Sequence, residues 1–338
     1  MERKLYLDSK PLLDTYGFLA DLLAVIASVD KEGIWLAANY NNLVGYRPGM
    51  PFCLYELSII QNRECGLNMF YQCPFIDFYK YRRIEVTGNQ VIDFMREYIN
   101  CGYYILVNVD RQYLSFYHMS LCSNHEIMVY GFNDTIKEFI LCDNSADGKY
   151  RTDIRCGYEE MKKGYEKYIV DNDKLDLHDS IVLLKPTADR YGYVFSIETF
   201  ILHIREYLNY VPIFGGREHN EYWVYGFENY SYLTEYVKKI IASQGKELKK
   251  DIRCFCALYD HKKSLRYTFD YFSKKGMLIG NEIVAKYNKI ENIALLIRNL
   301  MLKLQIKYQE KDAYLLLQYM IQLQEMERST LEKFLQGC

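Results

Sequence analysis

The chain has 338 residues, half of them hydrophobic and a quarter charged. This balance is typical of a folded globular protein, excludes an intrinsically disordered chain, and at this length allows one large domain or two ordinary ones. The formal net charge of −2 provides no global positive field, so we do not expect nucleic-acid binding.

The N-terminal sequence MERKLYLDSKPLLD has neither the apolar core nor the small-residue cleavage site of a secretory signal. The longest apolar stretches, such as residues 18–26, are interrupted by charge and are much shorter than a bilayer span. We therefore expect a cytoplasmic protein that does not enter the membrane and whose cysteines are reduced thiols.

The ten cysteines include no CxxC pair. Cys254 and Cys256 would share one face of a strand, but a structural zinc ion needs two further ligands that the sequence does not indicate. We expect buried thiols here, and neither a metal nor a cofactor.

In chain order, the first predicted element is a helix over residues 15–28, where apolar side chains recur at helical spacing. Residues 35–44 are predicted to be extended, and the proline- and glycine-containing residues 47–51 indicate a turn. A second helix is predicted over residues 89–100.

Beyond residue 100 the composition becomes β-branched and aromatic, which favours strands. Three strands are predicted, over residues 103–109, 127–132 and 137–143, the last two joined by the short polar turn Asn133-Asp134-Thr135. A helix over residues 159–168 and a strand over residues 181–185 are predicted to follow.

From about residue 196 the pattern is helical almost throughout, with predicted helices over residues 197–207, 232–243, 262–274, 281–309 and 313–335. The fourth carries one apolar stripe, typical of a core or a partner-helix face: Ile283, Tyr287, Ile290, Ala294, Ile297, Met301 and Leu304. The fold class is thus α+β followed by all-α, with domains predicted at residues 1–190 and 191–338.

A histidine and an aspartate are placed for chemistry on the predicted hairpin. His125 stands at the start of one strand and Asp143 at the end of the next. Antiparallel neighbours lie about 5 Å apart, so the carboxylate can fix the imidazole tautomer and stabilise the imidazolium. The alternative is that His125 caps a strand and Asp143 begins a turn, and spacing alone does not decide between them.

The order of these motifs resembles a known family. The chain has, in this order, a strand that begins with Gly102 and aromatic residues, a histidine before a strand that ends in Tyr130-Gly131, and a strand that ends in aspartate. This order resembles that of papain-like double-glycine peptidases. The order resembles more closely the N-terminal domain of the butirosin biosynthesis protein H family, associated with nonribosomal-peptide gene clusters. Residues 223–227 and 258–263 look like the helical C-terminal part of its members.

The resemblance implies a papain-like N-terminal domain with a central antiparallel sheet. In the family, a cysteine at the start of the first helix attacks an acyl thioester on a carrier protein, and the acyl group then passes to an amine. By resemblance His125 takes the role of base and Asp143 that of its orienting group. The implied partners are an acyl or peptidyl carrier protein and a small-molecule amine or peptide.

The sequence departs from the family at the nucleophile, because no cysteine precedes Cys53. By resemblance Thr15 or Tyr16 stands where the thiol is expected, and a threonine hydroxyl is a poor nucleophile without a strong base and an oxyanion hole. Other thiols that stay open as nucleophiles are Cys53, Cys65, Cys73 and Cys122.

Two functions follow. The first is acyl transfer or amide-bond formation in specialised-metabolite biosynthesis, with His125 deprotonating an amine that attacks a carrier-bound thioester. The second is a catalytically degenerate papain-like protein that binds a peptide product or a synthetase. The missing cysteine favours the second, as do the 34 tyrosines, whose side chains suit half-wet interfaces. An ordinary protease fits worst.

Surface features of the helical half leave further alternatives open. The lysine pairs at 238–239, 249–250 and 262–263 are either solvated faces or a docking surface for an acidic carrier protein. His261 is either a second polar site or a histidine satisfied at a helix start. The long C-terminal helices can pack on the same chain or on a second copy, so a homodimer also stays open.

Overall fold

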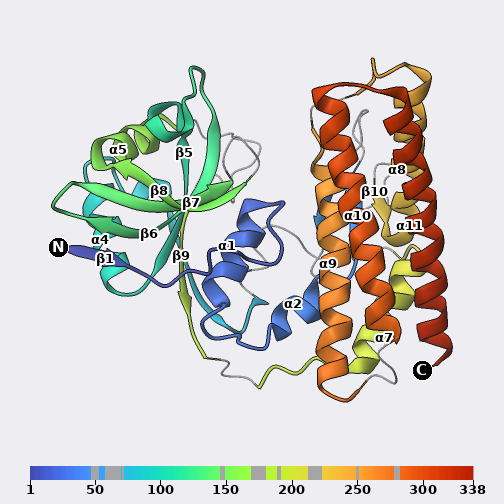
Figure 1. Cartoon of the computed structure of the whole chain (residues 1–338). Helices are drawn as coiled ribbons and strands as arrows, with labels where there is room; N and C mark the ends of the chain where they lie inside the picture. Colours follow the sequence, from blue (N-terminus) through green and yellow to red (C-terminus); the bar gives the residue numbers. More distant parts are fainter. Residues whose placement is uncertain are drawn as a thin grey trace. The chain divides into compact units, whose positions relative to one another are not determined.

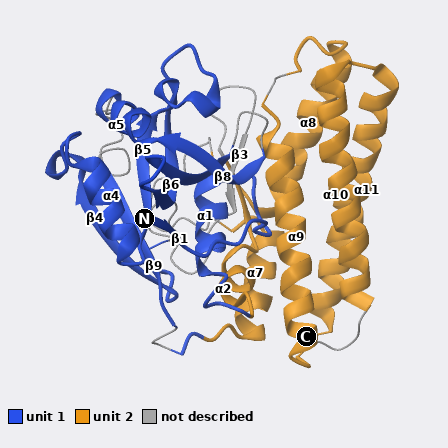
Figure 2. Ribbon diagram, turned by 60° about the vertical axis from the view of Figure 1, so that its left-hand side comes forward, with its two compact units in different colours: residues 1–31, 66–193 blue, residues 32–65, 194–338 orange. Residues whose placement is uncertain are grey.

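The computed structural model describes residues 1–46, 53–57, 70, 72–144, 149–168, 180–188, 192–211, 223–248, 251–277 and 282–337. It is a mixed α/β protein with a central antiparallel sheet and C-terminal helices (Figure 1). The chain divides into two compact units: unit 1 comprises residues 1–31 and 66–193, and unit 2 comprises residues 32–65 and 194–338 (Figure 2). Residues 32–65, which the sequence analysis assigned to the first domain, group instead with the helical unit.

Unit 1 is built on a seven-stranded antiparallel sheet in the order β4-β9-β5-β6-β7-β8, with β1 paired to β6. Its strands are β1 (Glu2–Lys4), β4 (Ile76–Arg82), β5 (Tyr104–Asp110), β6 (Asn124–Asn133), β7 (Glu138–Asn144), β8 (Tyr150–Gly157) and β9 (Ser180–Pro186). β9, the last strand of unit 1 along the chain, therefore lies between β4 and β5 in the interior of the sheet.

Helices cover the sheet because its central strands are apolar on both faces. All seven residues of β5 are buried, as expected for a strand with a covered face on either side. On one face of the sheet, apolar side chains of the strands form a hydrophobic cluster with those of α4 (Val91–Asn100) and α5 (Tyr158–Lys167). On the other face lies α1 (Gly17–Ile26), whose Asp21 accepts a hydrogen bond from Cys142 of β7.

Most predicted elements of this unit are confirmed. The helices predicted at residues 15–28, 89–100 and 159–168 correspond to α1, α4 and α5. The predicted strands correspond to β5, β6, β7 and β9, and β6 pairs with β7 as an antiparallel hairpin. Strands β1, β4 and β8 were not predicted. β1 consists of three charged residues and has no apolar pattern, whereas β4 and β8 carry the alternation of apolar with polar side chains that is typical of half-buried strands, and this signal was missed.

One predicted strand is wrong. Residues 35–44 do not form an extended segment: α2 (Ile34–Asn39) is a short buried helix, and only the end of the segment enters β2 (Leu43–Tyr46). The continuous apolar part of this segment, residues 35–38, is too short for a periodicity that separates a buried strand from a buried helix. The turn predicted at residues 47–51 lies outside the described residues.

Unit 2 contains a small antiparallel sheet and long helices. The sheet has the order β10-β2-β3, with β3 at Cys53–Leu57 and β10 at Trp223–Tyr225. The predicted helices are confirmed as α7 (Ile197–Leu208), α8 (Asn229–Ala242), α9 (Arg253–Lys274), α10 (Glu282–Ile306) and α11 (Glu310–Gln336). α9 begins before the predicted start at residue 262.

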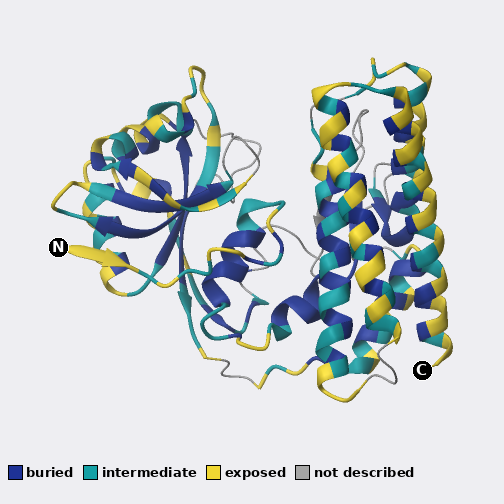
Figure 3. Cartoon of the chain, viewed as in Figure 1, coloured by how far each residue is buried: buried dark blue, intermediate teal, exposed yellow. Residues whose placement is uncertain are grey.

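The apolar stripe predicted on α10 faces the core of this unit. Six of its seven residues are buried, and Ile283 is half-buried (Figure 3). Within the residues described, no helix is both long enough and apolar enough to cross a membrane.

Candidate functional site

His125 and Asp143, predicted from their spacing, meet at one end of the sheet of unit 1. His125 is the second residue of β6 and lies opposite Val109 of β5. Its Nδ1 is 3.5 Å from Asp143 Oδ1 and 2.6 Å from the backbone carbonyl oxygen of Glu126. The imidazole is 38% exposed, whereas the carboxylate is buried. The carboxylate of the pair is therefore inside the fold, and part of the imidazole ring is in contact with solvent.

The contacts of Nδ1 determine the tautomer of His125. A carbonyl oxygen only accepts hydrogen bonds, so the short contact to Glu126 requires a proton on Nδ1. A neutral imidazole with its proton on Nδ1 keeps a lone pair on Nε2. No described residue makes a hydrogen bond to Nε2. Nε2 is thus the nitrogen that can accept a proton from a bound molecule.

Asp143 is held by several polar groups at the end of β7. The Tyr117 hydroxyl, at the end of a short 3-10 turn (Ser115–Tyr117), donates to Oδ2 at 2.7 Å. The Arg111 guanidinium lies 3.5 Å from the same oxygen. Burial raises the pKa of Asp143, while His125, Tyr117 and Arg111 act in the opposite direction by stabilising the carboxylate.

The first helix begins beside this pair. The side-chain amide of Asn144 donates to the backbone carbonyls of Asp14 and Thr15, at 3.3 and 3.2 Å. A Cβ built on Gly17, the first residue of α1, would lie 3.8 Å from Asp143 Oδ1. Thr15, predicted by resemblance to occupy the nucleophile position, therefore lies at the same end of the sheet as the histidine and the aspartate.

Two further carboxyl groups lie close to the pair, and sequence analysis did not identify them as site residues. Asp21 of α1 is buried and accepts hydrogen bonds from the Tyr150 hydroxyl at 2.7 Å and the Cys142 thiol at 3.4 Å. Burial raises its pKa well above the usual value, and Glu126 and Asp143 add to the increase. Burial, then the charge of Asp143, raises the pKa of Glu126 to about 7. The only sequence signal was the charge that interrupts the apolar run of α1.

The cysteine side chains that the structure describes do not supply an activated thiol. Burial raises the pKa of Cys73, Cys142 and Cys156, and a hydrogen bond with Asp110 raises that of Cys122. Within the described chain no thiol is hydrogen-bonded to His125. The Cys53 side chain and Cys65 lie outside the described residues.

The described residues contain no group of three or more His, Cys, Asp or Glu side chains that could hold a metal ion. Cys254 and Cys256 lie on α9 rather than on a strand. Residues two apart on a helix point in different directions, so the face they were expected to share does not exist.

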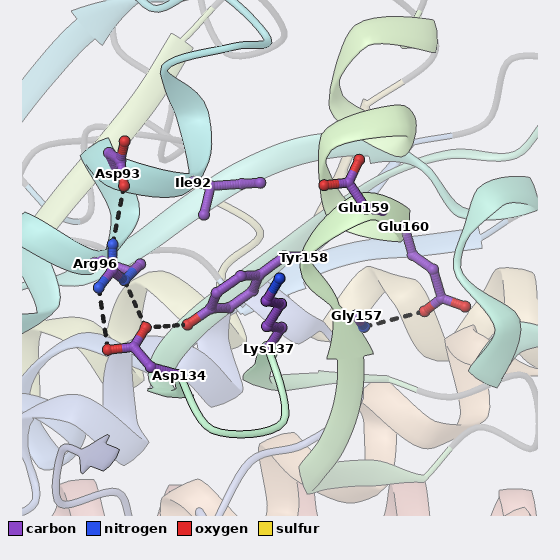
Figure 4. Close-up of a pocket in the computed structure, with 9 residues that line it drawn as sticks. All are labelled: Ile92, Asp93, Arg96, Asp134, Lys137, Gly157, Tyr158, Glu159 and Glu160. Carbon is purple, nitrogen blue, oxygen red and sulfur yellow. Dashed lines mark hydrogen bonds and ion pairs between the residues drawn. The ribbon is translucent and has the colours of Figure 1, made fainter. Parts of the chain in front are cut away.

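A separate depression on unit 1 is lined by charged side chains from α4, the β6–β7 turn and the start of α5 (Figure 4). Arg96 lies between Asp93 and Asp134, with nitrogen–oxygen distances of 2.9 and 2.7 Å. The Tyr158 hydroxyl donates to Asp134 at 2.9 Å. Because Arg96 of α4 and Tyr158 of α5 both bind Asp134 of the β6–β7 turn, this cluster is a link between elements; none of the predicted site residues lines it.

Among the described lysines of the three pairs in unit 2, Lys262 is not available to a docking surface. Lys262 is completely buried and cannot contact another protein. Lys239 is exposed but pairs with Glu235 at 2.8 Å, and residues 249–250 lie outside the described residues. His261 is also buried, with Nε2 3.1 Å from the backbone carbonyl of Asn41, and it lies within α9 rather than at its start.

Comparison of the sequence with models of protein families and with curated proteins found no match.

Proposed function

We propose that unit 1 carries a general-base site for acyl transfer, with His125 as the base and Asp143 as the group that orients it. The observation that carries the proposal is the hydrogen bonding of the imidazole. The Nδ1 proton is held between the Glu126 carbonyl and Asp143, and Nε2 has no hydrogen-bond partner among the described residues. A histidine held in one tautomer, with its other nitrogen reaching solvent, is equipped to accept a proton.

The reaction that we propose is amide-bond formation from a thioester carried by an acyl or peptidyl carrier protein. The amine nitrogen attacks the thioester carbonyl carbon, the new C–N bond forms, and the C–S bond breaks. His125 Nε2 takes a proton from the attacking amine and returns it to the departing thiolate, so the base is regenerated. Asp143 stabilises the imidazolium between these two transfers.

The acyl substrate, the amine acceptor and the place in nonribosomal-peptide-like biosynthesis rest on the sequence resemblance to the butirosin biosynthesis protein H family. A papain-like arrangement in unit 1 is supported by three features. They are an antiparallel sheet, a histidine and an aspartate on neighbouring strands, and a helix that begins beside them. We further propose that the protein acts in the cytoplasm.

A non-catalytic binding protein is the second candidate, and the state of the cysteines favours it. Every described cysteine with a perturbed pKa is shifted upward, away from the reactive thiolate. In this case the same site would hold an acyl or peptidyl group without transferring it.

The test is an assay with an acyl-loaded carrier protein and an amine, in which amide formation is followed by mass spectrometry. His125→Gln should lower the rate by about 10²–10⁴-fold, because the proton acceptor is lost. His118→Asn is the matched control, since His118 is exposed and has a positive φ of 51° that asparagine tolerates. A wild-type rate in His125→Gln would exclude His125 from the mechanism.

Thr15→Val separates direct attack by the amine from covalent capture by the hydroxyl. Direct attack predicts that this variant keeps its activity, whereas a threonine nucleophile predicts that activity is lost. Tight binding of the acyl-carrier substrate by the wild-type protein with no product would support the binding function.

A further inference from the structure

The two oxygens of the Asp143 carboxylate have different neighbours. Oδ1 lies 3.5 Å from His125 Nδ1 and faces the start of α1, where a Cβ built on Gly17 would lie 3.8 Å from it. Oδ2 accepts a hydrogen bond from the Tyr117 hydroxyl at 2.7 Å and lies 3.5 Å from Arg111 Nη1. The oxygen that meets the imidazole is therefore distinct from the oxygen that is anchored to the rest of the fold.

Both anchoring residues come from the connection between β5 and β6. The backbone N–H of Tyr117 donates to the carbonyl of Leu114 at 3.1 Å, and both residues are buried in the hydrophobic cluster of the sheet. The Arg111 guanidinium donates to Ser123 Oγ at 3.2 Å and lies over the Tyr117 ring, 5.0 Å from its centroid. Packing therefore fixes the place of the Tyr117 hydroxyl independently of Asp143.

An anchor at Oδ2 restricts the rotation of the carboxylate. The terminal torsion of an aspartate side chain is broad, so an unanchored carboxylate turns readily and its oxygens exchange places. The bond from the Tyr117 hydroxyl is charge-assisted, which is the strong class of hydrogen bond. Burial, and then the charge of Asp143, raises the pKa of Tyr117, so the hydroxyl keeps its proton and continues to donate at neutral pH.

We propose that Tyr117 is a positioning residue for acyl transfer: by holding Oδ2 of Asp143, it keeps Oδ1 beside His125 while the imidazole carries the transferred proton. This inference rests on the proposed function of unit 1. Tyr117 is buried, so it acts through Asp143 and not on a bound molecule. The same contact also favours the ionised form of Asp143, which is the form that stabilises an imidazolium.

The ionisation of Asp143 depends on groups from several elements. Burial raises its pKa, and His125, Tyr117 and Arg111 lower it. Three neighbours whose negative charge would oppose its ionisation, and one cation opposite it in the sheet, complete the surroundings: Asp21 of α1, Glu126 of β6, Cys142 of β7 and Arg151 of β8. Removal of the Tyr117 hydroxyl should therefore raise the pKa of Asp143.

Tyr117→Phe tests the role in the amide-forming assay with an acyl-loaded carrier protein. The kcat should fall about 10–100-fold, because a hydrogen bond to a charged group is lost, whereas KM should not change. The acidic limb of the kcat profile should move to higher pH, because Asp143 then ionises later. Tyr158→Phe is the matched control: Tyr158 also donates to an aspartate, Asp134, at 2.9 Å, outside the site. It should leave kcat and the profile unchanged.

Two further variants show whether the effect passes through Asp143. Tyr117→Phe added to Asp143→Asn should lower kcat no further than Asp143→Asn alone, because the carboxylate that Tyr117 holds is already absent. Arg111→Gln removes the other group at Oδ2 and should move the acidic limb in the same direction as Tyr117→Phe. Circular dichroism shows whether each variant is folded, and Arg111→Gln decides the test if Tyr117→Phe is not.

Carbon-13 NMR of labelled aspartate measures the contact without any activity. The pKa of Asp143 should be higher in Tyr117→Phe than in the wild-type protein and the same in Tyr158→Phe. An unchanged pKa of Asp143, or a wild-type kcat profile in Tyr117→Phe when His125→Gln is inactive, would overturn this inference alone. A further loss of kcat in the double variant would also overturn it. A wild-type protein that forms no amide would instead overturn the proposed function, and this role with it.

Discussion

Lys262 and Glu327 form an ion pair in unit 2 in which neither side chain is exposed to solvent. Lys262 Nζ lies 2.8 Å from both carboxylate oxygens, and the Tyr230 hydroxyl donates to Glu327 at 2.6 Å. Two charges taken out of water are stable only when each one satisfies the other. The pair therefore makes the core of unit 2 dependent on both residues at once.

The first prediction is that Glu327→Gln destabilises the protein by about 3–5 kcal/mol, because Lys262 is left buried without a counter-ion. Chemical denaturation measures the change in the free energy of unfolding. Asp270→Asn is the control, since Asp270 pairs with Lys274 on the surface, and its loss should change stability by less than about 1 kcal/mol. Equal effects of the two substitutions would contradict the importance of burial.

The second prediction concerns His203 of α7, which is buried against Phe195. Burial lowers its pKa to about 4, so the ring is neutral in the folded protein, whereas in the unfolded chain it gains a proton near pH 6.5. Its contribution to stability is therefore complete above about pH 6.5, and about 1.4 kcal/mol is lost per pH unit as the pH falls toward 4.

His203→Phe should remove this part of the pH dependence. The measurement is urea denaturation of both proteins between pH 7.5 and about pH 4.5, compared as a difference. His118→Asn, which removes an exposed histidine, should leave the slope as in the wild-type protein. Parallel stability curves for wild type and His203→Phe would show that His203 does not titrate as we expect.

The third prediction is that Glu126→Gln stabilises the protein at neutral and alkaline pH. The pKa of Glu126 is raised to about 7, so the folded protein holds a proton that the unfolded chain loses near pH 4.5. The free energy of unfolding that Glu126 contributes falls as the pH rises from 4.5 to 7. The glutamine amide does not ionise and avoids this loss, which is at most about 3 kcal/mol.

Carbon-13 NMR of labelled glutamate provides a direct test of this assignment. The charge of Asp143 is the second cause of the raised pKa of Glu126, so Asp143→Asn should lower it. A Glu126 pKa that is the same in both proteins would show that the two carboxyl groups do not interact.

The fourth prediction concerns Gly226, which has a φ of 53°. An added Cβ would lie 2.2 Å from the backbone carbonyl oxygen of Tyr207. Gly226→Ala should therefore destabilise the protein by about 3 kcal/mol or more, through backbone strain and a steric clash. Thermal unfolding measures the change.

Gly276 is a matched control, with a φ of 70° and no atom within 4 Å of an added Cβ. Gly276→Ala should cost only the strain of the left-handed conformation, about 1–2 kcal/mol. If the two alanine variants were equally stable, the close approach of Tyr207 to Gly226 would not exist in solution.

Local patterns predicted the hairpin and the long helices. The β6–β7 hairpin follows from apolar runs on either side of the polar turn Asn133-Asp134-Thr135. The same spacing was enough to bring His125 to Asp143, because a short turn fixes which residues of the two strands are neighbours.

Features that depend on distant residues were not predictable. Lys262 looks like a surface residue beside Lys263, and only Glu327, far away in the sequence, explains its burial. Asp21 is similar, since its hydrogen-bond partners come from β7 and β8. Single-sequence patterns contain no information on such pairings, because the two partners share no periodicity.

The path of the chain limits how this protein can be divided. Residues 32–65 belong to unit 2, although both of their flanking segments belong to unit 1. A single cleavage after residue 193 would therefore leave β2 and β3 on the first fragment and β10 on the second. The small sheet would then be incomplete in both fragments. During synthesis, residues 32–65 also leave the ribosome long before the helices of unit 2. They can therefore be buried only after the rest of the chain has been made.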